Sequence, residues 1–200
     1  MGEQPNPWDR IQPQDAMSRH RGAKPPDFAI FDNICILGHN INMKKTKIYL
    51  DTSFISHFQQ DDAQEKTTET LELWNEFKKR NDIEIVISDL TLEEIRQCDE
   101  PKLTQITEIL SEIKVTILEE NSDNLKLAKT YLKNDILSDK SLSDLRHIAI
   151  AVMYECKYIV SWNFKHFVNP KTINAVSGLN LLNNLPMVNI VSPSMMLGGY

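Results

Sequence analysis

An acid at the end of a short apolar run is the residue in this sequence best placed for chemistry. Asp51 directly follows the apolar run at 48–50 and is itself followed by two hydroxyl residues, Thr52 and Ser53. A short apolar run with polar borders predicts a buried strand, and in open parallel sheets ligands bind beyond the carboxyl ends of the strands. Asp51 could instead only cap the helix that follows, since Asp, Ser and Thr are all good N-cap residues. This stretch alone leaves both interpretations open.

A second acid lies in the segment 90–98, which is predicted to be a helix. Leu92 and Ile95 are apolar at a helical spacing, so one face of that helix is expected to be buried. The segment contains two adjacent acids, of which Glu94 lies next to the apolar face while Glu93 points farther out. We expect Glu94 to be the functional acid, although the spacing alone does not exclude Glu93.

The third acid, Asp144, lies in the first turn of a helix predicted over 142–154, where the helix dipole stabilises a carboxylate. That helix is apolar or small almost all round at 148–152, which is typical of a helix packed inside a domain. Asp144 is therefore expected at the N-terminal end of a buried helix. The alternative is that it only caps this helix. His147 shares a face with Asp144, and a structural histidine is the simpler interpretation of it than a metal ligand.

A polar residue, Asn163, follows the apolar run at 158–162 and is expected to end its strand as Asp51 ends the first one. Two strand ends and two helices would then place four polar residues at the same edge of the sheet: Asp51, Glu94, Asp144 and Asn163. Buried carboxylates that cluster repel one another unless a cation neutralises them, and oxygen ligands suit Mg²⁺ or Mn²⁺. Such an ion can activate water and stabilise the charge that develops on a phosphodiester.

The elements that must position these residues alternate between strands and helices. Apolar runs predict strands at 48–50, 83–87, 115–118, 158–162 and 188–191, with helical patterns between them, and 195–200 is expected to fray. This alternation is typical of an α/β fold with a mostly parallel sheet. Residues 1–42 hold five of the nine prolines and show no sustained period. We therefore expect a flexible or non-native leader at 1–42, before a folded domain at 43–200.

Composition and charge exclude several classes of protein. The chain of 200 residues is 41% hydrophobic and 25% charged, as is ordinary for a globular protein. No apolar run approaches the roughly 18 residues of a membrane span, and no signal-peptide pattern is present. The default expectation is therefore a cytoplasmic protein that is not associated with a membrane. The net charge of −6 disfavours a passive nucleic-acid coat, but not a nuclease whose acids bind cations. The three cysteines are widely spaced, so neither a disulfide framework nor a zinc site is supported.

Four stretches of the sequence together resemble the ordered motifs of PIN-domain nucleases, and in particular bacterial VapC-type toxins and their solitary relatives. They are IYLDTS at 48–53, SDLTLEEI at 88–95, DLRHIAIA at 144–151 and VSWNFKH at 160–166. Each motif alone is weak, but four in this order within an α/β pattern are fairly specific. The resemblance covers roughly residues 45 to 191.

The resemblance implies a PIN-like fold, with a parallel β-sheet flanked by helices on both faces, and a metal-dependent endoribonuclease that hydrolyses RNA phosphodiesters. It implies that Mg²⁺ or Mn²⁺ is bound by Asp51, Glu94 and Asp144, and it favours Glu94 over Glu93. It also implies that Ser53, beside the first acid, forms a hydrogen bond within the catalytic site.

Asn163 departs from the family pattern, because many members have Asp at this position. An amide can still accept a hydrogen bond or bind a metal through its carbonyl, but it adds no charge, so a second metal ion would bind poorly. Toxin biology further implies a small antitoxin that occupies the site, and a homodimer. The basic residues near this end of the domain that could meet RNA are Lys165, His166, Arg146 and Lys171.

Three other functions fit parts of the sequence. A PIN-fold module that binds RNA or protein with weak or no catalysis is compatible with Asn163 and with the acidic total charge. A phosphatase with an aspartyl nucleophile would need a second acid two residues after Asp51, where Ser53 stands. A phospho-receiver domain would need a tight acidic pair at the first strand, which is absent there.

Overall fold

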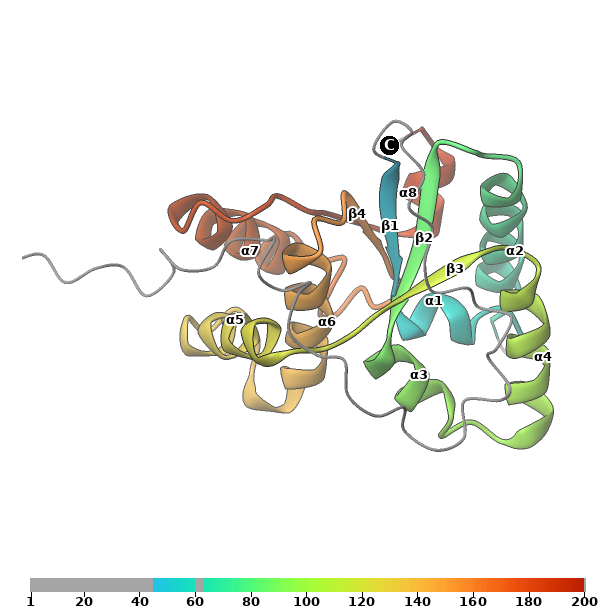
Figure 1. Cartoon of the computed structure of the whole chain (residues 1–200), viewed down its shortest axis with the longest axis horizontal. Coiled ribbons are helices and arrows are strands. Elements are labelled where there is room, and N and C mark those ends of the chain that lie inside the picture. The colour runs from blue at the N-terminus through green and yellow to red at the C-terminus, as the bar shows by residue number, and fades with distance from the viewer. Residues whose placement is uncertain (1–44, 60–62, 200) are drawn as a thin grey trace, which may run out of the picture.

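The computed structural model describes residues 45–59 and 63–199, which form a five-stranded parallel sheet between two layers of helices (Figure 1). The strands are β1 (Thr46–Leu50), β2 (Ile83–Ser88), β3 (Val115–Leu118), β4 (Tyr158–Val160) and β5 (Asn189–Val191), in the sheet order β3-β2-β1-β4-β5. The first described strand, β1, therefore lies in the middle of the sheet, and the later strands extend the sheet outward on both sides. The predicted α/β fold is confirmed, whereas the predicted leader at 1–42 lies outside the described residues.

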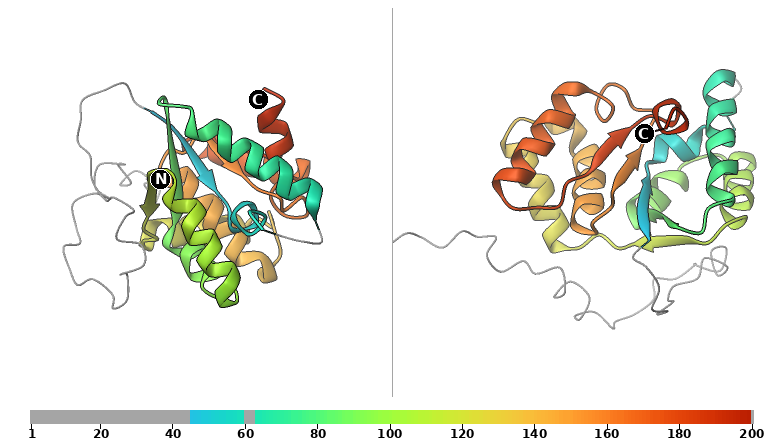
Figure 2. Two further views of the ribbon diagram at one scale, coloured as in Figure 1. Left: turned by 90° about the vertical axis from the view of Figure 1, so that its right-hand side faces the viewer. Right: turned by 90° about the horizontal axis from the view of Figure 1, so that it is seen from above.

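Side chains along each strand alternate between two hydrophobic cores, as the period of two in a strand requires. In β1, Ile48 and Leu50 lie in one core, and Tyr49 between them lies in the other. The core of Ile48 is covered by α1 (Thr52–Ser56), α2 (Gln64–Lys78), α3 (Asp89–Ile95), α4 (Glu100–Ser111) and α8 (Pro193–Leu197). The core of Tyr49 is covered by α5 (Ser122–Lys133), α6 (Leu142–Met153) and α7 (Pro170–Leu182). Figure 2 shows these layers from two further sides.

Helix α6 is packed inside the domain, as its composition predicted. Its residues from His147 to Val152 are all buried between the sheet and α5. A short 3₁₀ helix, η3 (Asp139–Ser141), leads into α6, so that Asp144 lies in its first turn. The apolar body of α6 thus fixes the position of an acid at its N-terminal end.

Polar residues at two strand ends start the next helix at once. Asp51 is the N-cap of α1 and accepts a hydrogen bond from the amide N–H of Ser53. Ser88 is the N-cap of α3 and forms a capping box with Thr91. Both turns lie at the carboxyl edge of the sheet, where β1 and β2 are neighbours. This is the edge at which parallel α/β sheets bind ligands.

Strand β4 is shorter than the sequence predicted, and this changes the position of Asn163. Leu50 pairs with Val160, the last residue of β4, so Ser161 and not Asn163 is the counterpart of Asp51. The expectation that Asn163 ends its strand as Asp51 does is therefore wrong. The ladder stops early because the amides at 162 and 163 donate to serine hydroxyls instead of strand carbonyls.

The expected fraying near the C-terminus is also wrong for the part of this segment that is described. Ser192 caps α8, accepting a hydrogen bond from the amide of Met195, and α8 packs beside α2. A proline in the first turn favours this start, because it needs no amide donor there. Within the described ranges, none of the helices has the length and apolar character that a membrane span requires.

Candidate active site

A chain of hydrogen bonds joins two of the predicted acids at the carboxyl edge of the sheet. Ser161 Oγ donates to Asp51 Oδ2 at 2.8 Å and accepts from the amide N–H of Asn163 at 3.0 Å. The side-chain amide of Asn163 in turn donates to Asp144 Oδ1 at 3.1 Å. Asp51 and Asp144 are thus fixed relative to each other, although they lie 93 positions apart in the sequence.

Asp51 is only 4% exposed, and among the described residues the hydrogen bonds to its carboxylate all end on one oxygen. Oδ2 accepts from Ser53 Oγ at 2.5 Å, from Ser161 Oγ at 2.8 Å and from the Ser53 amide at 3.2 Å. Oδ1 accepts none of the hydrogen bonds found among the described residues. The serine hydroxyls therefore orient this carboxylate and leave its second oxygen available to a ligand.

Glu94 lies between the same two segments. Its Oε1 accepts from Ser143 Oγ at 2.7 Å, and its Oε2 accepts from the Thr52 hydroxyl and lies 3.2 Å from His147 Nε2. Thr52 is the neighbour of Asp51 in the chain. Burial alone would raise the pKa of Glu94, but the hydrogen bond and charge of His147, with the hydroxyls of Thr52 and Ser143, outweigh burial and lower the pKa to about 2. The adjacent acid at position 93 is exposed, so Glu94 is the one that faces the site.

This lowered pKa predicts a pH-dependent contribution of Glu94 to stability. A carboxyl whose pKa falls from 4.5 to about 2 on folding stabilises the fold above pH 4.5, and that contribution is lost as the pH falls toward 2. We expect Glu94→Gln to lower the free energy of unfolding near pH 7 by on the order of 1–2 kcal/mol, after a discount for solvent screening. Urea unfolding in EDTA across this range measures the difference, which should shrink toward pH 2.

Glu93→Gln is the matched control for this measurement, because it makes the same chemical change at the exposed neighbouring position. We expect it to leave the free energy of unfolding unchanged at every pH. A deficit of Glu94→Gln that stayed constant from pH 7 to pH 2 would contradict the assigned hydrogen bonds.

Asn163 and His166 together hold Asp144. Asp144 Oδ2 lies 2.8 Å from His166 Nδ1, and the His166 amide N–H donates to Asn163 Oδ1 at 3.0 Å. Both polar atoms of the Asn163 side chain are thus used in orienting Asp144 and its histidine. Burial raises the pKa of Asp144, and the negative charge of Asp51 raises it further, against the lowering effect of His166 and His147. Asp51 is therefore near enough to Asp144 for the two carboxylates to repel each other.

Sequence reasoning missed two contributors to the site. Ser161 bonds Asp51, and only the correct end of β4 would have identified it as the counterpart of that acid. His147 is 2% exposed, and its Nδ1 lies 2.6 Å from the hydroxyl of Tyr49 while its Nε2 faces Glu94. Burial raises the pKa of Tyr49 well above its ordinary value, so its hydroxyl stays protonated. The interpretation of His147 as structural did not include this direct contact with an acid of the site.

The donor set fits the predicted Mg²⁺ or Mn²⁺ in its chemistry but only in part in its arrangement. The oxygens at this edge suit a hard cation, which would also relieve the repulsion between Asp51 and Asp144. Glu94 and Asp144, however, each have both carboxylate oxygens engaged by protein groups. Across 45–59 and 63–199, no three His, Cys, Asp or Glu side chains are arranged so that they could hold a metal ion. Asp51 is thus the acid with an unengaged oxygen, and Asp144 and Glu94 would each have to share or exchange a hydrogen bond to bind the same cation.

Comparisons with known proteins find likeness in solved structures alone. No protein-family profile matches the chain, and no curated protein sequence does. One similar structure is that of VapC20 from Mycobacterium tuberculosis, a toxin that cleaves the sarcin-ricin loop. The two sequences are 17% identical, the TM-score is 0.47, and the match covers 60% of this chain and 92% of that one. VapBC2 from Rickettsia felis, bound to a DNA fragment from its promoter, is 14% identical with a TM-score of 0.45, over 74% and 98% of the two chains. Both TM-scores are below 0.5, so the function proposed next rests on this chain's own residues.

Proposed function

We propose that this protein is a PIN-type endoribonuclease that hydrolyses RNA phosphodiesters with the help of Mg²⁺ or Mn²⁺. The observation that supports it best is the hydrogen-bonded cluster of Asp51, Glu94 and Asp144 at the carboxyl edge of a parallel sheet. A structural role alone would not require three acids from three separate elements to meet at this edge, because buried carboxylates are costly to desolvate.

Each residue of the proposed site has a distinct role. Asp51 would bind the cation through Oδ1, while Ser53 and Ser161 hold its other oxygen. Asp144 is held in place by Asn163, so the amide orients an acid instead of contributing a charge. The cation, bound by Asp51 and Asp144 with Glu94 as a third ligand, would supply charge that stabilises the phosphodiester and promotes ionisation of water.

Binding of the cation should be detectable without any substrate. A ligand that binds only the folded state raises its stability by mass action, by about 2.7 kcal/mol at a concentration a hundred times the Kd. We expect MnCl₂ or MgCl₂ to raise the melting temperature of the wild-type chain, and Asp51→Asn to remove most of that increase. Differential scanning fluorimetry measures both, with CaCl₂ and NaCl at equal ionic strength as controls for unspecific salt effects.

The activity itself is tested with a panel of structured RNAs. We expect the chain to cleave at least one of them in Mn²⁺ or Mg²⁺, and EDTA to stop the cleavage. A panel that stays intact under every metal condition, with a protein that is folded by circular dichroism, would contradict the proposed function.

A second candidate function is a PIN-fold module that binds RNA or protein and catalyses weakly or not at all. It is favoured by the engaged oxygens of Glu94 and by the lack, within the described ranges, of a ready three-ligand group. The two candidates differ in one outcome: a binding module would retain RNA affinity in EDTA and show no metal-dependent cleavage.

The resemblance of the four motifs extends the proposal to partners. A small antitoxin would cover the site, and the chain would associate as a homodimer. Multi-angle light scattering of the purified protein distinguishes a dimer from a monomer.

A further inference from the structure

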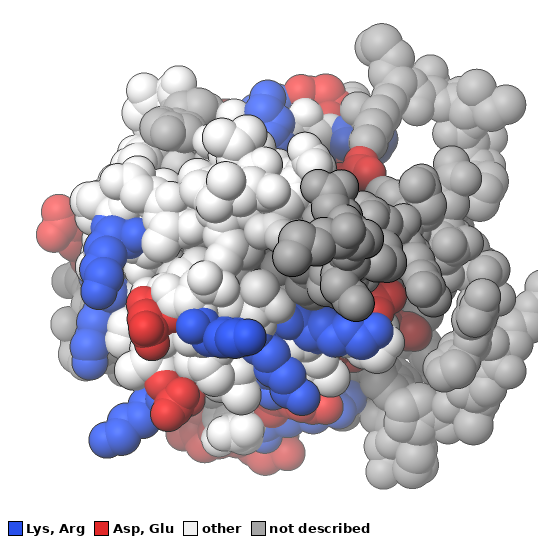
Figure 3. Space-filling model, turned by 90° about the vertical axis from the view of Figure 1, so that its left-hand side faces the viewer, with Lys and Arg blue, Asp and Glu red and all other residues white. Residues whose placement is uncertain are grey.

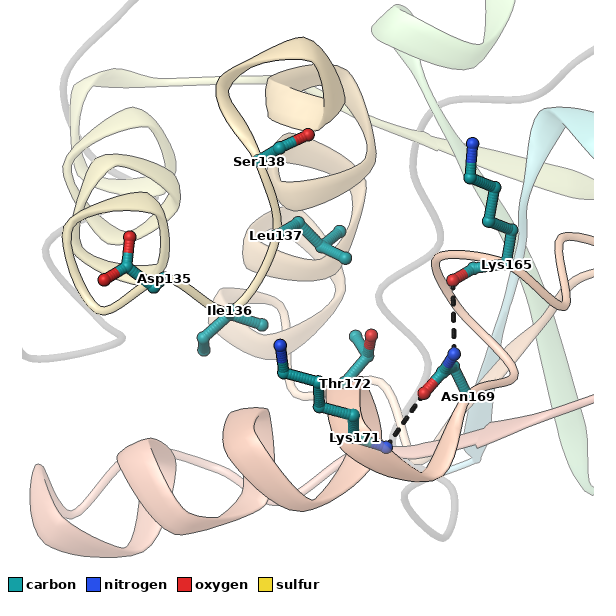
Figure 4. A pocket seen from close by; sticks show the side chains of 8 residues that line it. All are labelled: Asp135, Ile136, Leu137, Ser138, Lys165, Asn169, Lys171 and Thr172. Carbon is teal, nitrogen blue, oxygen red and sulfur yellow. Dashed lines mark hydrogen bonds between the residues drawn. The ribbon is translucent and has the colours of Figure 1, made fainter.

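A cavity of about 320 Å³ lies beside the candidate site, between the end of α5 and the start of α7 (Figure 4). One of its walls is the segment that contains Lys165. The next residue, His166, contacts Asp144 of the site. The cavity therefore adjoins the predicted catalytic residues, yet none of those residues lines it.

Thr172 provides the strongest sign that this cavity takes a ligand. Thr172 is only 2% exposed, and its side chain points into the cavity (Figure 4). Its hydroxyl forms no hydrogen bond with any residue of the described ranges. The hydroxyl is therefore open to a ligand in the cavity. A ligand with acceptor oxygens in the cavity would satisfy it.

The start of α7 adds a second donor at the same residue. Asn169, the N-cap, accepts the amide of Lys171 through its side chain and the amide of Ile173 through its backbone, each at 2.9 Å. The amide of Thr172 between them forms no hydrogen bond within the described part of the chain. Amides in the first turn of a helix favour anions, because their dipoles point toward the ligand. The hydroxyl and the amide of Thr172 thus both offer hydrogen atoms to an acceptor.

The charged residues at the rim of the cavity favour an anion. Lys165 and Lys171 are exposed and extend from its walls, and neither forms an ion pair within residues 45–59 and 63–199 (Figure 4). Asp135 also lines the cavity, but its carboxylate turns away from both lysines (Figure 4). The face of the molecule drawn in Figure 3 has both basic and acidic side chains. The two lysines at the rim therefore favour an anion in this cavity.

We propose that this cavity is a phosphate-binding subsite, in which Lys165, Lys171 and Thr172 hold a backbone phosphate of an RNA strand that extends from the catalytic residues. Lysines bind phosphate as point charges, and a hydroxyl with an open amide adds directed donors. The identification of the strand as RNA rests on the proposed function. The subsite is separate from Asp51, Glu94 and Asp144, so its role is to bind and orient substrate.

Binding measured without catalysis tests the subsite. A short, fluorescein-labelled single strand with 2′-O-methyl sugars is titrated with the full chain in EDTA, and fluorescence anisotropy is followed at several salt concentrations. We expect Lys165→Gln/Lys171→Gln to weaken binding about five- to twentyfold at low salt, and to reduce the salt slope by about 0.7 for each phosphate that the variant no longer neutralises. Thr172→Val should weaken binding about threefold with an unchanged salt slope, since it removes a neutral donor.

The matched control is Lys129→Gln/Lys133→Gln, which removes the same charge from α5 at positions that do not line the cavity. If both double variants weaken binding equally, the effect is one of net charge and the subsite is refuted. Absence of any binding by the wild-type chain also refutes it. Inorganic phosphate that displaces the strand only above tens of millimolar supports a backbone phosphate, whereas tight binding of phosphate alone would assign the cavity to the free anion and overturn the RNA assignment.

The subsite and the proposed function fail separately in these measurements. A chain that binds the strand through Lys165 and Lys171 but cleaves no RNA would refute the nuclease function alone. A chain that cleaves RNA, and whose Lys165→Gln/Lys171→Gln variant binds like the control variant, would refute the subsite alone.

Discussion

Asp51→Asn is expected to reduce RNA cleavage at least about a hundredfold while leaving the fold intact. The substitution removes the charge of a carboxylate whose second oxygen is free to meet a ligand, and loss of several kcal/mol of charge stabilisation corresponds to such a factor. The fold should survive because Asn is as good an N-cap as Asp. The side-chain carbonyl of Asn can still accept from Ser53 and Ser161. Single-turnover cleavage of a labelled RNA in Mn²⁺ measures the effect.

The control for this variant is Asp99→Asn, which makes the same change at an exposed N-cap whose side chain forms no capping hydrogen bond. It should cleave at the wild-type rate. Equal rates for Asp51→Asn and Asp99→Asn, with both proteins folded by circular dichroism, would exclude Asp51 from the chemistry.

Substitution of the buried histidine is expected to have the largest effect on stability among the residues around the site. His147→Leu removes both nitrogens of a 2% exposed ring, and so one of the partners of the Tyr49 hydroxyl and one of the partners of Glu94 Oε2. Buried polar groups that lose a partner cost about 1–3 kcal/mol each, so we expect a loss of about 2–4 kcal/mol. Urea unfolding at pH 7 in EDTA measures it, free of any effect of metal binding.

His166→Leu makes the same chemical change on a side chain that is 25% exposed and bonded to Asp144. Water can replace much of the hydrogen bonding that this variant removes, so we expect a loss below about 1 kcal/mol. His147→Gln, which keeps a donor, should fall between the two. Equal destabilisation by His147→Leu and His166→Leu would show that the hydrogen bonds to Tyr49 and Glu94 add little.

Much of the fold could be predicted because its strands are short apolar runs that both cores require. The run 115–118 became β3 without a change of boundary, and the apolar segment after Asp144 became the buried helix α6. The apolar spacing of Leu92 and Ile95 favoured Glu94 over Glu93 without excluding Glu93, and the resemblance of the motif favoured Glu94 further.

The rest depended on contacts that periodicity does not encode. The sequence around Trp162 is as apolar as a strand, but the serine hydroxyls of the site take its amides and end β4. The role of Ser161 follows from that ending, and the role of His147 depends on the hydroxyl of Tyr49 in a distant strand. Such side-chain networks depend on tertiary positions, so sequence spacing could suggest their members but not their partners.

Removal of two acids at once is the most direct test of the account that the carboxyl edge of the sheet is a catalytic site. One labelled RNA that the wild-type chain cleaves is incubated in Mn²⁺ with the Asp51→Ala/Asp144→Ala variant, at protein concentrations well above those needed by the wild type. We expect no cleavage above the EDTA background, from a protein that remains folded. Cleavage at the wild-type rate and at the same position would contradict the site.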